Sequence, residues 1–211
     1  MDGEGHERVG GQGEGRRFGG GSYGSGPGTL LWELLTSERY KDSVLGANAM
    51  VLGSQRPSME VILLAAGMSH VTTAEYGTIN ATHPDMTWIH PTELNQAAES
   101  VIGKYDVIAS FSSTEHSGLG RYGDPLNPSG DLMSLAQISC LLKPGGLLFF
   151  GVPTNIGQDR LQFNAHRIYG EKRLKLMFMQ FRVVGVAPTH SQGMNRNHQP
   201  WFVLQNKRGC A

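Results

Sequence analysis

Two apolar segments joined by one predicted helix, all within residues 105–153, constrain the fold most strongly. Residues 106–111 and 147–152 are almost continuously apolar, which is typical of parallel strands covered on both faces. Residues 131–142 predict a helix between them, and Lys143-Pro144-Gly145-Gly146 predicts the turn into the second strand. This strand–helix–strand unit favours an α/β domain, in which ligands bind at the carboxyl ends of the strands.

The rest of the chain repeats the alternation of short apolar strands with helical segments. Further strands are predicted at 49–52, 70–75, 86–89, 181–186 and 201–205, and further helices at 30–40, 57–66 and 93–101. The sequence therefore predicts an α/β fold with a mostly parallel central sheet of about seven strands and helices on both faces.

The first 28 residues differ in composition from the rest. They hold 12 of the 29 glycines, and their only aliphatic residues are Met1 and Val9. Because such a segment cannot bury a core, we expect residues 1–28 to be a disordered Gly-rich tail and residues 29–211 to form one domain.

Charge and targeting signals narrow the class of protein. The 18 basic residues balance the 18 acidic ones, so the composition gives no strong nucleic-acid signal, and Arg16 and Arg17 in the tail are too few to change this. No leader pattern and no apolar run of about 20 residues is present. Cys140 and Cys210 are isolated in the sequence, which favours a reducing compartment. A soluble, cytoplasmic protein is the default expectation.

Polar residues at the ends of the first two strands are candidates for a ligand site. Gly53 and Ser54 lie between a strand and a helix N-terminus, where backbone N–H groups favour polar or anionic groups. Glu75 ends the second strand, where an acidic residue can bind the hydroxyls of a ribose. The glycine-rich fingerprint is incomplete, since Gln55 and Arg56 occupy the turn. An ordinary turn with a solvated glutamate is an equally open interpretation.

A polar cluster follows the strand at 106–111. Glu115 and His116 stand side by side there, and a carboxylate beside an imidazole can position a substrate proton or act as a general base. The alternative is that the Ser, Thr and Glu side chains of this segment only satisfy backbone groups of the loop.

The segments after this cluster contain candidates for substrate binding. Arg121, Tyr122 and Asp124 lie in a Gly- and Pro-rich loop, which we expect to be a lid or a substrate-contact loop. His166 and Arg167 follow the fifth predicted strand and could approach the same site; a surface turn with an ordinary ion pair is the alternative. His190, His198 and Cys210 lack the spacing of metal ligands, so no metal site is expected.

These features together resemble a known family. The strand at 105–110, the Glu115-His116 pair and the LKPGG motif at 142–146 resemble the later motifs of class I S-adenosylmethionine-dependent methyltransferases. The resemblance implies a Rossmann-like sandwich in which the last strand is antiparallel.

A closer resemblance, over roughly residues 39–187, is to an uncharacterised methyltransferase-like family, a domain of unknown function. The matching stretches are YKDSV at 40–44, LGS at 52–54, EVILL at 60–64, HVTTAEY at 70–76, GRYGDPLNP at 120–128 and FNAHRIYG at 163–170.

The methyltransferase resemblance implies a cofactor and roles for particular residues. S-adenosylmethionine would lie with its methionine part at Gly53 and Ser54 and its ribose at Glu75. Ser110 and Ser112 would face the reacting centre, and the partner would be a small molecule or another unidentified methyl acceptor.

The chain departs from the methyltransferase pattern at three positions. Val51 stands where an acidic residue is usual, and Gln55 and Pro57 stand where glycines are usual. Two alternatives therefore remain open: a non-catalytic binding or scaffold protein that has lost the cofactor, and a nicotinamide-dependent oxidoreductase. An antiparallel seventh strand at the sheet edge would argue against the oxidoreductase.

Overall fold

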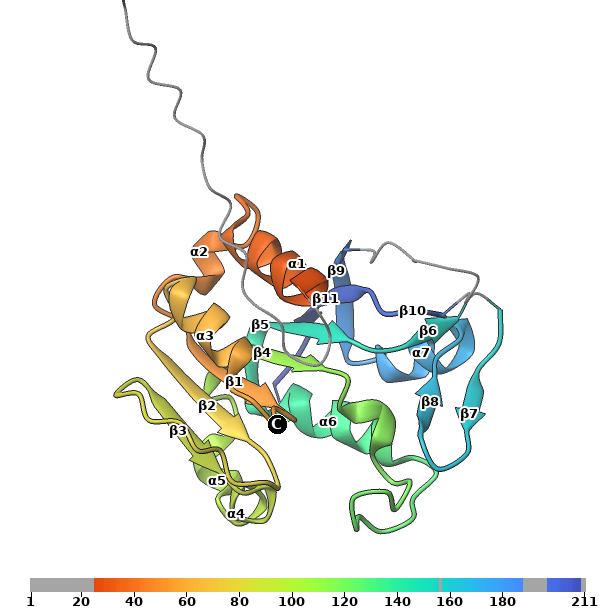
Figure 1. Ribbon diagram of the computed structural model, residues 1–211. Helices are drawn as coiled ribbons and strands as arrows, with labels where there is room; N and C mark the ends of the chain where they lie inside the picture. The colour runs from red at the N-terminus through yellow and green to blue at the C-terminus, as the bar shows by residue number, and fades with distance from the viewer. Residues whose placement is uncertain (1–24, 156, 188–196, 210–211) are drawn as a thin grey trace, which may run out of the picture.

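The computed structural model describes residues 25–155, 157–187 and 197–209, and one seven-stranded sheet organises them (Figure 1). In spatial order the strands are β3 (Met86–Ile89), β2 (His70–Ala74), β1 (Asn48–Leu52), β4 (Tyr105–Phe111), β5 (Leu142–Gly151), β11 (Trp201–Asn206) and β9 (Phe181–Ala187). The five strands from β3 to β5 are parallel to one another.

The last strand, β11, runs antiparallel to both of its neighbours, β5 and β9. The prediction of a mostly parallel sheet with an antiparallel last strand is therefore confirmed. Its expected place at the sheet edge is wrong, because β11 lies between β5 and β9. The strand order reverses between β1 and β4, which leaves a crevice at their carboxyl ends, where open α/β sheets bind ligands.

Helices cover both faces of the parallel strands, and the side chains of successive strand residues point to opposite faces of the sheet. In β1, Val51 packs into a cluster with α1 (Ser25–Thr36), α2 (Lys41–Val44) and α3 (Ser58–Ala65). Its neighbour Met50 packs into a second cluster with helices of the other face. Those helices are α4 (Pro91–Gln96), α5 (Ala98–Val101), α6 (Gly130–Leu141) and α7 (Glu171–Met177). The period-two alternation of side chains explains why such strands are apolar at almost every position.

The structure differs from the sequence predictions at several element ends. The first helix, predicted at 30–40, is α1 at Ser25–Thr36, so it includes residues 25–28 of the segment assigned to the tail. Pro27 suits its first turn, and Trp201 Nε1 donates a hydrogen bond to the Pro27 carbonyl at 2.9 Å. The helix predicted at 93–101 is two helices, α4 and α5, and the side chain of His90 caps α4.

The turn predicted at Lys143–Gly146 is a bulge within β5. Tyr105 pairs with Leu142 and Val107 pairs with Leu147, so four residues of β5 project between two ladder positions. Gly145 has φ 80°, a conformation that favours glycine. Four short strands were not predicted from the sequence. They form two antiparallel pairs: β6 (Thr154–Asn155) with β10 (Asn197–His198), and β7 (Arg160–Gln162) with β8 (His166–Ile168).

Several predictions concern residues that lie outside the described part of the chain. These are the disordered state of the tail up to residue 24, with Arg16 and Arg17, and the roles of His190 and Cys210. They stay predictions.

Candidate functional site

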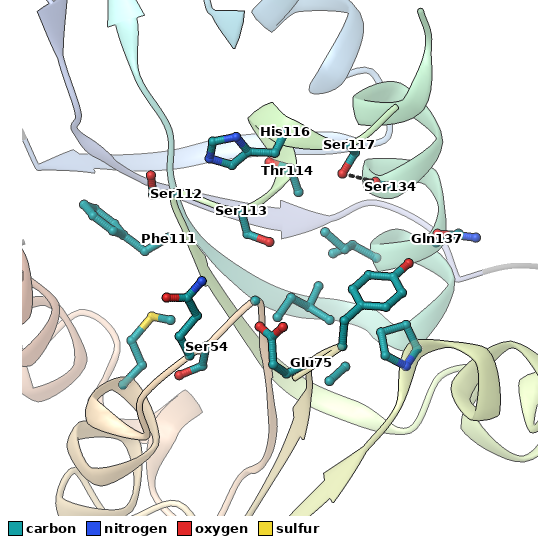
Figure 2. A pocket seen from close by; sticks show the side chains of 18 of the residues that line it. Ser54, Glu75, Phe111, Ser112, Ser113, Thr114, His116, Ser117, Ser134 and Gln137 are labelled. Carbon is teal, nitrogen blue, oxygen red and sulfur yellow. Dashed lines mark hydrogen bonds between the residues drawn. The ribbon is translucent and has the colours of Figure 1, made fainter. Parts of the chain in front are cut away.

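A cavity of about 1160 Å³ opens at the carboxyl ends of β1, β2 and β4 (Figure 2). Figure 2 shows Ser54 and Glu75 on one side of it and Thr114, His116 and Ser134 on the other. Its volume exceeds the range of about 300–1,000 Å³ that is usual for the pocket of one drug-sized ligand. The cavity therefore has room for two ligands side by side.

Gly53 begins the turn after β1, and only glycine fits there. Its φ is 75°, and its N–H donates to the Ala74 carbonyl at 3.1 Å, which joins the ends of β1 and β2. A Cβ atom at this position would lie 2.1 Å from Ser113 Oγ and 2.5 Å from Ser113 Cβ. The backbone of the β1 turn and the segment after β4 therefore approach each other closely at the floor of the cavity.

The turn after β1 rests on a carboxyl group that has no exposed surface. Glu60, in α3, accepts a hydrogen bond from Thr73 Oγ1 of β2 at 2.8 Å, and its Oε2 lies 3.1 Å from Ser54 Oγ. Ser54 Oγ also lies 2.7 Å from the Arg56 carbonyl. A hydroxyl has a single proton, and the carbonyl can only accept, so Ser54 donates to Arg56 and accepts from Glu60. This arrangement requires a protonated Glu60.

The electrostatic surroundings of Glu60 agree with this assignment. Burial raises the pKa of Glu60, and the nearby Glu75 raises it further, while the hydrogen bond from Thr73 opposes the shift. Glu60 therefore acts as a neutral hydrogen-bonding bridge that ties α3, β2 and the β1 turn together.

We expect Glu60→Gln to be at least as stable as the parent at pH 7, because the amide keeps both a donor and an acceptor. The pKa of Glu60 is raised on folding, so the unfolded chain loses this proton first as the pH rises. The free energy of unfolding of the parent should therefore fall relative to Glu60→Gln as the pH rises above the ordinary value of 4.5. Urea unfolding of both proteins between pH 4 and pH 8 measures the difference.

Glu60→Leu is the matched control for this prediction. It leaves Ser54 and Thr73 without their partner, which costs about 1–3 kcal/mol at every pH. A stability difference between the parent and Glu60→Gln that does not change with pH would show that folding does not raise the pKa of Glu60.

Glu75 follows β2 and lines the cavity. Its Oε1 accepts a hydrogen bond from the Gly77 N–H at 3.1 Å, and its carbonyl accepts one from Trp88 Nε1 at 3.0 Å. Tyr76, the next residue of the lining, packs edge-on against the ring of His90 at 5.3 Å between centroids. The ring of Tyr76, packed against His90, therefore lies next in sequence to the Glu75 carboxylate.

The segment after β4 holds a buried carboxyl group behind the cavity wall. Ser112 has φ 54°, an uncommon conformation for a residue other than glycine, and its Oγ donates to Glu115 Oε1 at 2.7 Å. Burial raises the pKa of Glu115 to about 7, against the lowering effect of the Ser112 hydrogen bond. The other oxygen of Glu115, Oε2, has no hydrogen-bond partner among the described residues.

His116 stands in front of Glu115 and lines the cavity. Its Nδ1 lies 2.8 Å from the Ala165 carbonyl, which can only accept, so Nδ1 carries a proton and Nε2 has the free lone pair of the neutral ring. Burial lowers the pKa of His116, and His166 and Arg121 lower it further. The ring is therefore neutral at pH 7, with Nε2 4.0 Å from Glu115 Oε1.

Hydrogen bonds within the loop, and one to a neighbouring turn, hold the loop that carries Tyr122 and Asp124. Asp124 accepts hydrogen bonds from the backbone N–H groups of Gly118 (2.6 Å) and Tyr122 (3.4 Å). Arg121 donates to the Asn164 carbonyl at 2.9 Å, which ties the loop to the turn between β7 and β8. Tyr122 and Asp124 line the cavity.

Arg167 is 7% exposed and supports this loop from below. Its guanidinium donates to the carbonyls of Ser117 at 2.6 Å and Asn127 at 3.3 Å, and its Nε lies 3.6 Å from Asp131 Oδ2. Asp131 is fully buried in the first turn of α6 and also accepts hydrogen bonds from Arg173. The ion-pair cluster of Arg167, Asp131 and Arg173 therefore holds the base of the loop.

The structure brings many of the predicted site residues to the cavity, but not all of them. Gly53, Ser54, Glu75, Ser112, His116, Tyr122 and Asp124 line it. Ser110, Glu115, Arg121, His166 and Arg167 do not. Ser110 is buried in β4, Glu115 lies behind His116, and the ring of His166 packs against the ring of His116 at 5.8 Å.

Sequence reasoning missed the wall that α6 contributes. Met133, Ser134 and Gln137 line the cavity from this helix. Ser134 and Gln137 are three residues apart and so share one helical face, which is a signal that the sequence contains. Thr114, in the short 3₁₀ helix Thr114–His116, also belongs to the lining.

Two kinds of feature are absent from the described residues. No group of three or more His, Cys, Asp or Glu side chains there is arranged to hold a metal ion. No helix in the same ranges combines the length and apolar character needed to cross a membrane.

Solved structures with the same fold include methyltransferases and a protein described as a putative hemolysin. The 1,6-didemethyltoxoflavin-N1-methyltransferase of Burkholderia thailandensis, with bound S-adenosylhomocysteine, has a TM-score of 0.64 and 15% identity over 85% of this chain and 76% of its own. The N-methyltransferase NodS of Bradyrhizobium japonicum, also with S-adenosylhomocysteine, has a TM-score of 0.55 and 13% identity over 85% of each chain. A putative hemolysin from Streptococcus thermophilus has a TM-score of 0.58 and 17% identity over 94% of this chain and 70% of its own.

At such low identity these likenesses establish the fold, which is the Rossmann-like class I methyltransferase fold that the sequence predicted. No curated protein matches the chain. A family model does match, over residues 46–199, which is more than half of the chain. The chain therefore belongs to the family DUF268, described as a Caenorhabditis protein of unknown function.

Proposed function

We propose that this protein is an S-adenosylmethionine-dependent methyltransferase. The observation that carries the proposal is one continuous cavity that joins the Gly53 turn, the Glu75 carboxylate and the His116 imidazole at the carboxyl ends of three adjacent strands. Related folds in solved structures hold S-adenosylhomocysteine. The volume of the cavity suits a methyl donor and an acceptor together.

The residues of the cavity suit the donor. Gly53 and Ser54 would take its methionine part, because both line the cavity at the end of β1 and Gly53 has no side chain to block a ligand. Glu75 would accept hydrogen bonds from the two ribose hydroxyls, and Tyr76 beside it offers an aromatic edge to the base. S-adenosylmethionine supplies a methyl group on a positively charged sulfur, and holding donor and acceptor in line supplies much of the rate.

Some of the site residues would contact ligands directly, and others would position the residues that do. His116 would be the general base, since its neutral ring presents Nε2. Glu115 would position His116 and Ser112 rather than contact the acceptor, because it is fully buried. Tyr122 would contact the acceptor, and Arg167 would hold the loop in place.

One observation favours a non-catalytic binding protein as the second candidate. Val51, at the position where methyltransferases usually carry an acidic residue, is fully buried in the apolar cluster under α1 and α3. It offers no carboxylate to the amino group of a methionine moiety. The oxidoreductase alternative is less favoured, because the antiparallel β11 is a methyltransferase feature.

Calorimetry with S-adenosylmethionine and S-adenosylhomocysteine tests the leading proposal. We expect both to bind, and no heat from either at millimolar concentration would contradict the methyltransferase assignment. Transfer of a radioactive methyl group from S-adenosylmethionine to any component of a cell extract would exclude the non-catalytic alternative.

Glu75→Ala is expected to weaken binding of S-adenosylhomocysteine. Hydrogen bonds to a charged group contribute about 1.5–3 kcal/mol, so the dissociation constant should rise about tenfold or more. Glu99→Ala, on the exposed surface of α5, is the matched control and should bind as the parent does. Unchanged affinity in Glu75→Ala would refute the ribose role.

A further inference from the structure

The part of the cavity beside β4 and α6 differs in chemistry from the part at Gly53 and Glu75. We call it the acceptor half; its side chains include Thr114, His116, Tyr122, Asp124, Met133, Ser134 and Gln137. Arg56 and Glu75 lie in the other half, at the β1 and β2 ends. Among the described lining residues, the acceptor half therefore contains no lysine or arginine.

The arginines beside the acceptor half and its lining carboxylate, Asp124, are already paired. Both oxygens of Asp124 accept hydrogen bonds from backbone N–H groups of its own loop. Arg167 donates to loop carbonyls, and Arg121 donates to Asn164 and lies over the ring of Tyr122, 5.7 Å from its centroid. Neither arginine lines the cavity. The acceptor half therefore offers an anionic ligand no fixed positive charge.

A buried hydroxyl in this half lacks a partner. Thr114 is 4% exposed and lines the cavity, and its Oγ1 has no hydrogen-bond partner among the described residues. Buried polar atoms are rarely left unpaired, because the loss of hydration costs about 1–3 kcal/mol. Figure 2 shows Thr114 between His116 and the Ser117–Ser134 pair. Thr114 lines the cavity while its Oγ1 lies just under the surface, so rotation about the Cα–Cβ bond would turn this neutral hydroxyl toward a ligand beside the neutral base His116.

The tautomer of His116 restricts the reacting atom of such a ligand. Nδ1 is protonated, so Nε2 can only receive a proton. A base of this kind is useful when the nucleophile carries a proton that must leave as the new bond forms. A hydroxyl or a ring N–H meets this condition, whereas a thioether or a tertiary amine has no proton to give.

We propose that the methyl acceptor is an uncharged molecule whose nucleophile is a hydroxyl or ring N–H group, bound with a hydrogen bond to Thr114 and its acidic proton directed at Nε2 of His116. This inference rests on the proposed methyltransferase function. The acceptor oxygen or nitrogen forms a bond to the methyl carbon while the carbon–sulfur bond breaks. The sulfur keeps the electron pair, and the acceptor proton passes to Nε2 and then to water.

Phenol and benzoate serve as probes, since they share one ring and differ in charge at neutral pH. The experiment follows the imidazole signals of His116 by NMR while each probe is titrated into the full chain saturated with S-adenosylhomocysteine. We expect phenol to shift the His116 signals and to bind at least about tenfold more tightly than benzoate. Tighter binding of benzoate, or unshifted His116 signals with tens of millimolar phenol, would overturn the proposal.

Thr114→Val tests the hydrogen bond at nearly constant side-chain volume. Loss of one neutral hydrogen bond should weaken phenol binding about three- to tenfold. Thr82→Val, on the exposed surface away from the cavity, is the matched control and should bind phenol as the parent does. Circular dichroism melting of both variants shows that they are folded, and an unchanged affinity for phenol in folded Thr114→Val would refute the role of Thr114.

The failure of this inference can be told apart from the failure of the methyltransferase proposal. If calorimetry shows no binding of S-adenosylhomocysteine, the methyltransferase proposal fails. The same phenol titration on the ligand-free protein still reports whether the acceptor half selects an uncharged ring. If S-adenosylhomocysteine binds and benzoate is preferred, only the acceptor class is wrong.

Discussion

Replacing Asp131 with leucine is expected to lower the free energy of unfolding by about 3–5 kcal/mol. Asp131 is fully buried, and its carboxylate forms ion pairs with both Arg167 and Arg173. Without it, Arg167 remains a buried guanidinium with no counter-charge, which is far more costly than the loss of an exposed ion pair. Urea unfolding followed by circular dichroism measures the change.

Three further variants separate charge from packing at this position. Asp131→Asn keeps the shape and an accepting oxygen, so it should lose less stability than Asp131→Leu. Arg167→Met combined with Asp131→Leu removes the buried charge and should be less destabilised than the sum of the two single changes. Asp42→Leu, on the exposed surface of α2, should stay within about 0.5 kcal/mol of the parent. Equal stability of Asp131→Leu and the parent would show that the cluster is not important for folding.

Gly53→Ala is expected to weaken S-adenosylhomocysteine binding by about 10- to 100-fold, the effect of losing one hydrogen bond to a charged group of the ligand. The alanine Cβ would meet Ser113 Oγ at 2.1 Å, so the β1 turn or the segment after β4 must move at the floor of the cavity. The left-handed backbone conformation adds about 1–2 kcal/mol of strain. Calorimetry measures the affinity, and the melting temperature reports the strain.

Gly46 provides a matched control for this prediction. It has φ 74°, close to that of Gly53, but no atom lies within 4 Å of a Cβ placed on it. Gly46→Ala should therefore lower stability by a similar strain and leave the affinity unchanged. The double variant Gly53→Ala/Ser113→Gly removes the colliding atoms and should recover part of the affinity. An affinity of Gly53→Ala equal to that of the parent would mean that the turn does not contact the ligand.

The fold could be predicted from the sequence because its strands are buried on both faces. β4 and residues 147–151 of β5 are nearly continuous apolar segments, and the helices between strands have the period that packs against a sheet. The short strands β7 and β8 could not be predicted in this way. They have three residues each, and all three residues of β7 are exposed, so no apolar pattern marks this pair of strands.

Site residues that directly follow a strand could be predicted from the sequence. Residues whose role depends on contacts with distant parts of the chain could not. Gly53, Glu75 and His116 each follow a strand, so their place at one edge of the sheet comes from the fold itself. Arg167 looks like a substrate ligand in the sequence. Its partners are backbone carbonyls about 40 to 50 residues away along the chain, and no local pattern reveals that they occupy its donors.

The burial of Glu60 could not be predicted from the sequence either. Its segment is an apolar helix in sequence, and a glutamate there is expected to face water. The structure buries it because Ser54 and Thr73 offer hydrogen bonds that only the folded chain brings together.

The place of β11 between β5 and β9 has a consequence for the order in which the protein can fold. During synthesis, β5 and β9 are both made before the strand that separates them, and each must leave one hydrogen-bonding edge open until residues 201–206 arrive. The parallel half of the sheet can form earlier, but its β5 edge stays open to wrong partners during that interval. Late insertion of one strand therefore completes the sheet, and the cavity, whose lining includes Trp201 of that strand, is complete only after this step.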